Sequence, residues 1–103
     1  MNDHRLWLRV VDFGAEPGLV CLVEEAVIGR DFRCDVVISD DEASRMHARL
    51  MPLPGGSWQI LDLGTTNGTF VNAERIVGPA TLAPGDVIRV GRASCSVEVP
   101  AVI

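Results

Sequence analysis

Short apolar runs, each interrupted after a few residues by turn-forming residues, are the feature that most constrains the fold of this chain. The runs are rich in Val, Leu and Ile, and clusters of Gly, Pro, Asn and Asp separate them. No segment has the sustained 3.6-residue period of an amphipathic helix. An α/β fold would need helices of roughly 10 to 15 residues between its strands. The pattern therefore predicts an all-β fold, either a sandwich or a barrel.

The positions of the interruptions predict where the strands and turns lie. Strands are expected at Leu6–Phe13, Leu19–Val23, Ala26–Gly29, Val36–Ile38, His47–Met51, Trp58–Leu61, Thr69–Val71, Arg75–Ile76, Val87–Val90 and Cys95–Val99. Residues 52–56 are expected to connect a hairpin, and Pro84-Gly85-Asp86 to form a tight turn. With 103 residues, 48% of them hydrophobic, and no linker or repeat, residues 1–103 are expected to form a single domain.

The charge balance limits the partners of the chain. A formal net charge of -5 argues against broad binding to nucleic acid or to anionic membranes, because both need a cationic surface. Any anion site must therefore be local. No apolar run approaches the roughly 20 residues of a membrane span, and no signal-peptide core is present. We expect a soluble, cytoplasmic protein without membrane insertion.

The cysteines point away from a disulfide framework and from a metal site. There are three, which is an odd number, and none belongs to a C-x-x-C pair. Cys21 and Cys95 fall in strand patterns and Cys34 in an expected loop, so all three are expected to be reduced. No cofactor and no metal are expected.

The dipeptide Gly29-Arg30 ends an apolar run and opens a loop. Arg30 can project from the end of a strand, while glycine permits close approach of another backbone. The alternative is a solvated arginine that pairs with Asp31 or Asp35.

The motif Ser44-Arg45-Met46-His47 follows an acidic loop. The Ser44 hydroxyl can donate to a phosphate oxygen, and Arg45 adds positive charge. A nucleophilic serine is disfavoured because no elbow motif surrounds it and the only other histidine is His4. His47 is expected to be structural, with its ring nitrogens joining neighbouring loops.

The motif Thr66-Asn67-Gly68-Thr69 contains Asn-Gly, a strong hairpin signal, so a simple turn is one interpretation. The presence of the two other motifs upstream favours a second interpretation. If the apolar runs fold into one sandwich, the three turns can bring a guanidinium, a hydroxyl and an amide to the same end, and that set suits a phosphate.

Taken together, residues 27–99 resemble a forkhead-associated (FHA) domain. The family's Gly-Arg, Ser-Arg-x-His and Thr-Asn-Gly-Thr-x-Val-Asn motifs occur in order and near their usual spacing. The resemblance implies an eleven-stranded sandwich of two twisted, mainly antiparallel sheets, the FHA/SMAD-like fold. It also implies that loops at one end bind a phosphothreonine peptide.

The resemblance assigns roles to individual residues. Arg30 and Ser44 would hold phosphate oxygens, and Thr66 would add a hydroxyl or backbone contact. Asn67 would hydrogen-bond the peptide main chain, and Arg45 fits a secondary contact to phosphate or peptide. The residues implied to support the loops are Gly29, His47, Gly68 and Asn72.

One position departs from the family pattern. Ala73 follows Asn72, where the family often has glycine. Alanine at positive φ carries a steric cost that glycine does not, so the geometry of this turn is uncertain from sequence. The residues implied to contact phosphate are unaffected.

The acidic run Asp40-Asp41-Glu42 lies beside the implied site, where family members read peptide residues beyond the phosphothreonine. These carboxylates are expected to disfavour acidic residues at that part of the peptide, because like charges brought together weaken binding. The alternative is a solvated acidic turn without a role in binding.

Three classes of function follow from these observations. The first is a non-catalytic module that binds a phosphothreonine-containing protein, either a substrate of a Ser/Thr kinase or the kinase itself. The second is a phospho-independent scaffold of the same fold, with exposed apolar residues near Trp7 or at 100–103 as a contact surface. The third, a hydrolase of phosphoproteins, is disfavoured because neither a metal-ligand cluster nor a paired general acid and base is apparent.

Overall fold

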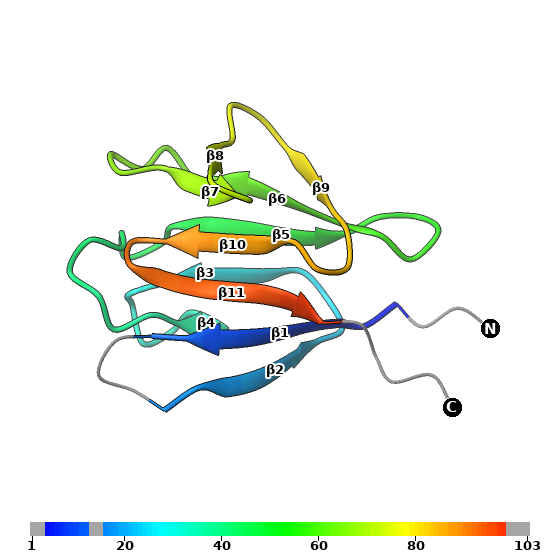
Figure 1. Cartoon of the computed structure of the whole chain (residues 1–103), viewed down its shortest axis with the longest axis horizontal. Helices are drawn as coiled ribbons and strands as arrows, with labels where there is room; N and C mark the ends of the chain where they lie inside the picture. The colour runs from blue at the N-terminus through cyan, green and yellow to red at the C-terminus, as the bar shows by residue number, and fades with distance from the viewer. Residues whose placement is uncertain (1–3, 13–15, 99–103) are drawn as a thin grey trace.

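The computed structural model of the chain describes residues 4–12 and 16–98, which form two β-sheets packed face to face (Figure 1). The strands are β1 Leu6–Val11, β2 Gly18–Leu22, β3 Ala26–Gly29, β4 Val36–Val37, β5 Ala48–Pro52, β6 Trp58–Asp62, β7 Thr69–Val71, β8 Glu74–Arg75, β9 Ala80–Leu82, β10 Val87–Val90 and β11 Ala93–Glu98. The predicted all-β sandwich of eleven strands is confirmed. The described part of the chain contains no helix long and apolar enough to cross a membrane.

The strands divide into a six-stranded and a five-stranded sheet. Their orders are β2-β1-β11-β10-β7-β8 and β4-β3-β5-β6-β9. The first and last strands of the sandwich, β1 and β11, pair along five residues each in the middle of the larger sheet. All paired strands run antiparallel except β3 and β4. β3 is thereby held between the edge strand and β5, which fixes the direction in which the chain leaves Gly29.

Alternation along the strands builds the core. In β11 and β10 every second residue is buried, as expected for strands with one face toward the opposite sheet. The largest fully buried apolar side chains come from both sheets and from the residue that follows β4: Leu8, Ile28, Ile38, Leu50, Ile60, Ile88 and Val90. Each such side chain contributes about 1.5 to 3 kcal/mol through burial, so the core can hold short strands in place.

The sequence missed one strand and misplaced some ends. β9, Ala80–Leu82, was not predicted because it has only three residues and lies between Pro79 and Pro84. β5 begins at Ala48 rather than at His47, because the residue pairing with β3 and β6 starts at Ala48. The expected ends at Phe13 and Val99 fall outside the described residues.

The turn between β7 and β8 shows how the family departure is accommodated. Val71 pairs with Glu74 across two residues, and both of these, Asn72 and Ala73, have positive φ values of 52° and 70°. That combination is typical of a type I′ hairpin. Ala73 therefore occupies a left-handed conformation and carries the steric cost that glycine avoids.

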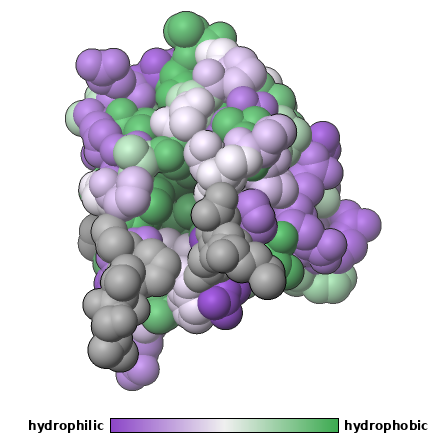
Figure 2. Space-filling view, turned by 90° about the vertical axis from the view of Figure 1, so that its right-hand side faces the viewer, coloured by the Kyte–Doolittle hydropathy of each residue, from purple (hydrophilic) through white to green (hydrophobic). Residues whose placement is uncertain are grey.

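The loops that follow β3, β6 and β10, and the one that precedes β5, gather at the left-hand end of the molecule in Figure 1. β1 begins and β11 ends at the opposite end. Figure 2 shows that opposite end, where hydrophobic side chains surround a depression. A hollow of about 350 Å³ there is lined by residues that include Trp7, Trp58 and Leu82. The Trp58 indole donates to the main-chain oxygen of His4 at 2.8 Å.

Candidate functional site

The loops after β3 and before β5 are joined by main-chain hydrogen bonds. The Arg30 amide donates to the Ser44 carbonyl at 2.9 Å, and the Asp31 amide donates to the Arg45 carbonyl at 3.1 Å. These bonds continue the β3 to β5 pairing into the loops. The first two sequence motifs are thus brought together by backbone, without relying on their side chains.

Gly29 allows this close approach. It is buried, and a Cβ built on it would lie 2.1 Å from the main-chain oxygen of Arg45. Non-bonded atoms do not approach each other so closely, so any side chain at this position would push the two loops apart. Glycine is required here by the space available and not by a left-handed backbone.

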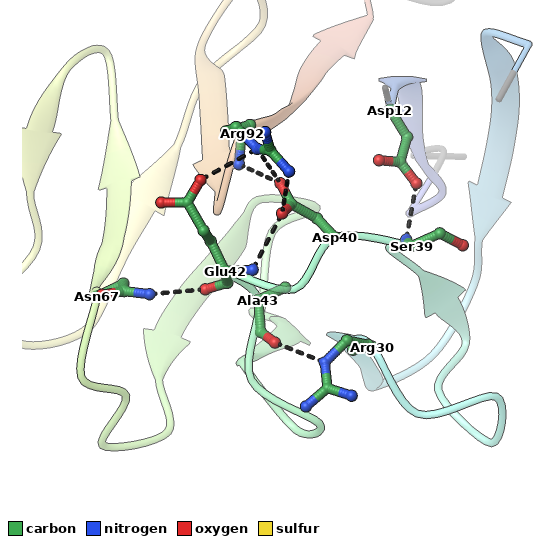
Figure 3. A network of polar contacts seen from close by, with 8 residues as sticks. All are labelled: Asp12, Arg30, Ser39, Asp40, Glu42, Ala43, Asn67 and Arg92. Atoms are coloured by element: carbon green, nitrogen blue, oxygen red, sulfur yellow. Dashed lines mark hydrogen bonds and ion pairs between the residues drawn. The ribbon is translucent and has the colours of Figure 1, made fainter. Parts of the chain in front are cut away.

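The Arg30 guanidinium is held at one edge and open at the other. Its Nε donates to the Ala43 carbonyl at 3.0 Å, while the terminal nitrogens make no hydrogen bond to the described residues and point away from the network (Figure 3). The alternative pairing with Asp31 or Asp35 is wrong. Asp31 pairs with Arg33 at 2.9 Å, and the Asp35 carboxylate accepts a main-chain amide. Arg30 therefore presents two donors to solvent in a fixed orientation.

His47 joins two of the loops from inside the protein. It is fully buried, its Nδ1 accepts the Ser44 amide at 3.0 Å, and its Nε2 lies 2.8 Å from the Gly68 carbonyl. A neutral imidazole protonated on Nε2 satisfies both contacts, whereas a second proton on Nδ1 would face an amide donor. The side chain therefore fixes the distance between Ser44 and the loop that carries Asn67.

Asp62, at the end of β6, organises the loop that follows. Its carboxylate accepts bonds from the Gly64 and Thr65 amides and from the hydroxyls of Thr65 and Thr69, all at 2.7–3.0 Å. Burial alone would raise the pKa of Asp62, but these hydrogen bonds outweigh it and the pKa lies below the usual value. The Thr65 hydroxyl in turn accepts the Gly68 amide at 2.9 Å.

Asn67 and Thr66 stand exposed at the tip of this loop. The Asn67 Nδ2 donates to the Glu42 carbonyl at 2.9 Å, and its Oδ1 makes no hydrogen bond to the described residues. The Thr66 carbonyl accepts Arg75 at 3.3 Å. Gly68 has a φ of 85°, and a Cβ there would lie 2.5 Å from the Arg75 Nε. Arg75 therefore supports the loop from behind.

A buried carboxylate braces the loop before β5. Asp40 is 3% exposed and accepts the Arg92 amide at 2.6 Å, the Arg92 guanidinium at 3.2 Å and the Glu42 amide at 3.0 Å (Figure 3). Arg92 also lies 3.0 Å from the Glu42 carboxylate. The alternative of a solvated acidic turn is thus wrong for Asp40, which is buried and paired, while Asp41 is exposed.

The Asp40 bonds affect its ionisation. The Glu42 amide, followed by the Arg92 guanidinium and amide, lowers the pKa of Asp40 to about 2. The carboxylate is therefore charged throughout the physiological range. Because the carbonyls of Glu42 and Ala43 hold Asn67 and Arg30, this one group steadies both side chains through the main chain.

Comparison with known proteins agrees with this geometry. The sequence model of the FHA domain matches residues 26–91, the region that contains all three motifs. The chain belongs to the FHA domain family. The family is a binding module, and its identification agrees with the resemblance seen in the sequence.

Relatives and solved structures support the assignment. The FHA domain-containing protein FhaB of Mycobacterium tuberculosis is 37% identical over 91 residues, which cover 86% of this chain and 58% of FhaB. The chain thus spans little more than half the length of that relative. The FHA domain of the CT664 protein from Chlamydia trachomatis has a TM-score of 0.85 at 28% identity, covering 94% of this chain and 99% of that one. Mycobacterium tuberculosis EmbR, solved in complex with a low-affinity phosphopeptide, has a TM-score of 0.79 at 28% identity. The match covers 94% of this chain and 25% of the EmbR chain.

The remaining sequence-predicted residues of this FHA domain take different places. The Arg45 side chain is exposed beside Ser44, and its carbonyl accepts the Cys34 thiol at 3.2 Å. Asn72 lies outside the cluster: its amide donates to Asp86 and its Oδ1 accepts the Val87 amide. It supports the connection between β9 and β10 and not the loops around Arg30.

Sequence reasoning missed the residues that brace this FHA domain from below. Asp40 and Arg92 are far apart in the chain, so no local pattern links them. Asp62 carried a usable signal, because an aspartate followed by Gly64 and Thr65 favours a turn closed by its own side chain. Within residues 4–12 and 16–98, no group of three or more His, Cys, Asp or Glu is placed to hold a metal ion.

Proposed function

We propose that this FHA domain is a phosphothreonine-dependent protein-interaction module. The single observation that carries the proposal is the open edge of the Arg30 guanidinium beside Ser44, in a loop held to Asn67 by the Glu42 carbonyl. A phosphothreonine brings about 1.5 to 2 negative charges and three acceptor oxygens. Two guanidinium nitrogens and a hydroxyl match those oxygens.

Each of these side chains makes a different contact with the proposed ligand. Arg30 and Ser44 hold phosphate oxygens, and Arg45 adds a peripheral charge. The Asn67 Oδ1 accepts a main-chain amide of the peptide, and Thr66 adds a hydroxyl or backbone contact. Local donors suffice, which reconciles anion binding with the net charge of -5.

The ligand in this proposal is a protein phosphorylated by a Ser/Thr kinase, or the kinase itself. The phosphopeptide complex of the related EmbR supports the phosphate dependence. The three cysteines are free, which is consistent with the reducing cytoplasm expected from the sequence. The module needs no catalytic step, and purified protein is expected to release no inorganic phosphate from a phosphopeptide.

Calorimetry with matched peptides tests the proposal. A degenerate phosphothreonine library supplies the best binder, which is then compared with its unphosphorylated and phosphoserine forms. Arg30→Ala is expected to lose at least about tenfold in affinity, because removing one partner of a buried charge pair costs about 2 to 5 kcal/mol and 1.4 kcal/mol is tenfold. Arg33→Ala is the control, since Arg33 is exposed nearby and paired with Asp31. Unchanged binding by Arg30→Ala, with the fold intact, would refute the site.

A phospho-independent scaffold is the second candidate. The apolar hollow between Trp7 and Trp58, at the end away from Arg30, is the observation that favours it (Figure 2). The other surface suggested by the sequence, residues 100–103, lies outside the described residues. Equal binding of phosphorylated and unphosphorylated peptide would favour the scaffold.

A further inference from the structure

A hollow of about 280 Å³ lies between the edge strands of the two sheets, β2 and β4, near the lower side of the molecule in Figure 1. Valine side chains from three strands line it: Val10 of β1, Val20 of β2, and Val36 and Val37 of β4. β2 pairs only with β1, and β4 only with β3, among the described strands. Each therefore leaves one side without a pairing strand, where an extended segment can add. None of Arg30, Ser44 and Asn67 lines this hollow, so it is separate from the candidate phosphothreonine site.

The charged residues that line the hollow are all acidic. They are Asp12 after β1, Glu16 before β2 and Asp35 before β4. Asp35 accepts the Val27 main-chain amide at 2.9 Å, and Glu16 is exposed. Within the described part of the chain, none of the three carboxylates forms an ion pair. A cation that enters the hollow therefore meets three carboxylates and no positive charge in the lining.

Asp12 has an oxygen atom without a hydrogen-bond partner. The residue is 7% exposed, and one oxygen, Oδ2, accepts the Ser39 amide at 2.7 Å (Figure 3). The other oxygen, Oδ1, is buried and accepts no hydrogen bond from any described residue. A buried acceptor of this kind is costly unless a donor reaches it. The most buried carboxylate of the hollow can thus accept a further, charged donor.

The lining of the hollow fits a cation with an apolar stem. Its three carboxylates do not converge on a metal position, since no group of three or more acidic, His or Cys residues in the described ranges is placed to hold a metal ion. The valines would give a metal no ligand either. A lysine or arginine side chain has both parts that this lining needs, an aliphatic stem for the valines and N–H donors for the carboxylates.

The β2 edge can direct such a side chain into the hollow. Val20 lies opposite the buried Leu8 in the β1–β2 pairing, and Gly18 lies opposite Val10, so positions 18 and 20 face the inside of the sandwich. In an added strand, the residues opposite these two positions point their side chains to the same side. Gly18 leaves the necessary room, because a Cβ built there meets nothing within 4 Å.

We propose that this hollow binds a lysine or arginine side chain of a partner protein, presented from an extended segment that adds to the edge of β2. The stem packs on the valines and the charged end bonds to Asp12, while the exposed Asp35 and Glu16 add attraction. The net charge of -5 also favours a basic partner. The site goes beyond the proposed phosphothreonine binding and does not require a phosphate on the partner.

The test is an NMR titration in which the amide signals of the protein report both affinity and place. The probes are short, acetylated and amidated peptides of Val and Thr with lysine, norleucine or glutamate at the centre, and butylammonium as a free amine. Asp12→Asn removes the charge and keeps an acceptor for the Ser39 amide. Gly18→Leu keeps every charge and fills the hollow at a position without positive φ. Glu74→Gln is the control, because it removes an exposed charge on β8, at the other edge of the same sheet.

The wild type is expected to bind the lysine peptide at least about tenfold more tightly than the norleucine peptide, which has the same stem without the charge. The largest shifts are expected at the amides of Val20, Val37 and Ser39. Equal binding of the lysine and norleucine peptides overturns the inference. Binding of butylammonium without binding of the lysine peptide also overturns it, because the ligand is then a small amine and not a protein segment.

The variants separate the hollow from general charge effects. Asp12→Asn and Gly18→Leu each lose the preference for lysine, whereas Glu74→Gln keeps it. A preference that survives either of the first two substitutions, or an equal loss in Glu74→Gln, overturns the inference. Arg30→Ala is expected to keep the lysine preference, so a failure of phosphopeptide binding is a distinct result that bears only on the proposed function.

Discussion

Asp40 and Arg92, 52 positions apart in the chain, form a pair in which one buried carboxylate accepts both the amide and the guanidinium of the arginine. The pair connects the loop before β5 to the turn between β10 and β11, and thereby connects the two sheets at the end that carries Arg30. The same carboxylate accepts the Glu42 amide. It therefore sets the course of the main chain on which both Arg30 and Asn67 rest.

Replacing Asp40 with alanine is expected to destabilise the domain. The change leaves the amides of Arg92 and Glu42 without an acceptor, and each buried donor left unsatisfied costs about 1 to 3 kcal/mol. Urea unfolding measures the loss, and phosphopeptide affinity is expected to fall as well. Asp41→Ala is the control, because this exposed neighbour should change stability by no more than about 0.5 kcal/mol. Equal effects of the two substitutions would contradict the role of Asp40.

Acid is expected to weaken the fold in a defined range of pH. The pKa of Asp40 is about 2 in the folded protein and that of Asp62 is also lowered, whereas an unfolded aspartate has a pKa of about 3.9. Groups with a depressed folded pKa contribute stability that is present above the unfolded pKa and is lost as the pH falls toward the folded pKa. Urea midpoints should therefore drop between about pH 4 and pH 2. Asp40→Asn should flatten this acid dependence, and an unchanged slope would argue against the assignment.

Gly29→Ala is expected to damage both stability and binding. The new Cβ would overlap the Arg45 carbonyl, so the loops that carry Arg30 and Ser44 must separate. Forcing extra atoms into such a site costs about 1 to 3 kcal/mol. The matched control is Gly18→Ala in β2, where a Cβ meets nothing within 4 Å and the change should be neutral or slightly stabilising. Thermal unfolding and phosphopeptide titration of both variants distinguish steric damage from a general effect of glycine.

Ala73→Gly is expected to stabilise the protein. The alanine has a φ of 70°, and a left-handed conformation costs a residue with a Cβ about 1 to 2 kcal/mol. Glycine relieves that cost but loses more entropy on folding, so the net gain should be at most about 1 kcal/mol. Ala83→Gly, at an exposed loop position without positive φ, should instead be neutral or destabilising. A lower midpoint for Ala73→Gly would show that the turn is not strained.

Local patterns were sufficient for much of this fold. Short runs rich in Val, Leu and Ile, bounded by turn-forming residues, located β10 to the residue and the start of β1 at Leu6. β9 was missed because a strand of three residues is too short to show a pattern. Its place is set by pairing with β6, a contact that sequence order does not show.

The candidate site was likewise predictable only in part. Arg30, Ser44 and Asn67 could be predicted as site residues because their neighbours form recognisable motifs, and the structure places those motifs together. The residues that support them from beneath could not be predicted from sequence. Asp40 looked like part of a solvated acidic run, and only its long-range contact with Arg92 turns it inward. Charge counts along a sequence do not reveal which carboxylates are neutralised in three dimensions.

Arg30 and Asn67 are both anchored to carbonyl oxygens, those of Ala43 and Glu42. Every amino acid offers the same carbonyl, so substitutions of the outward-facing side chain at position 42 leave that anchorage intact. Mutation at position 42 can therefore change the chemistry of the surface around the candidate site while Arg30 and Asn67 keep their orientation. During evolution, such a domain can acquire a new ligand preference without first losing the main-chain contacts that orient these two side chains.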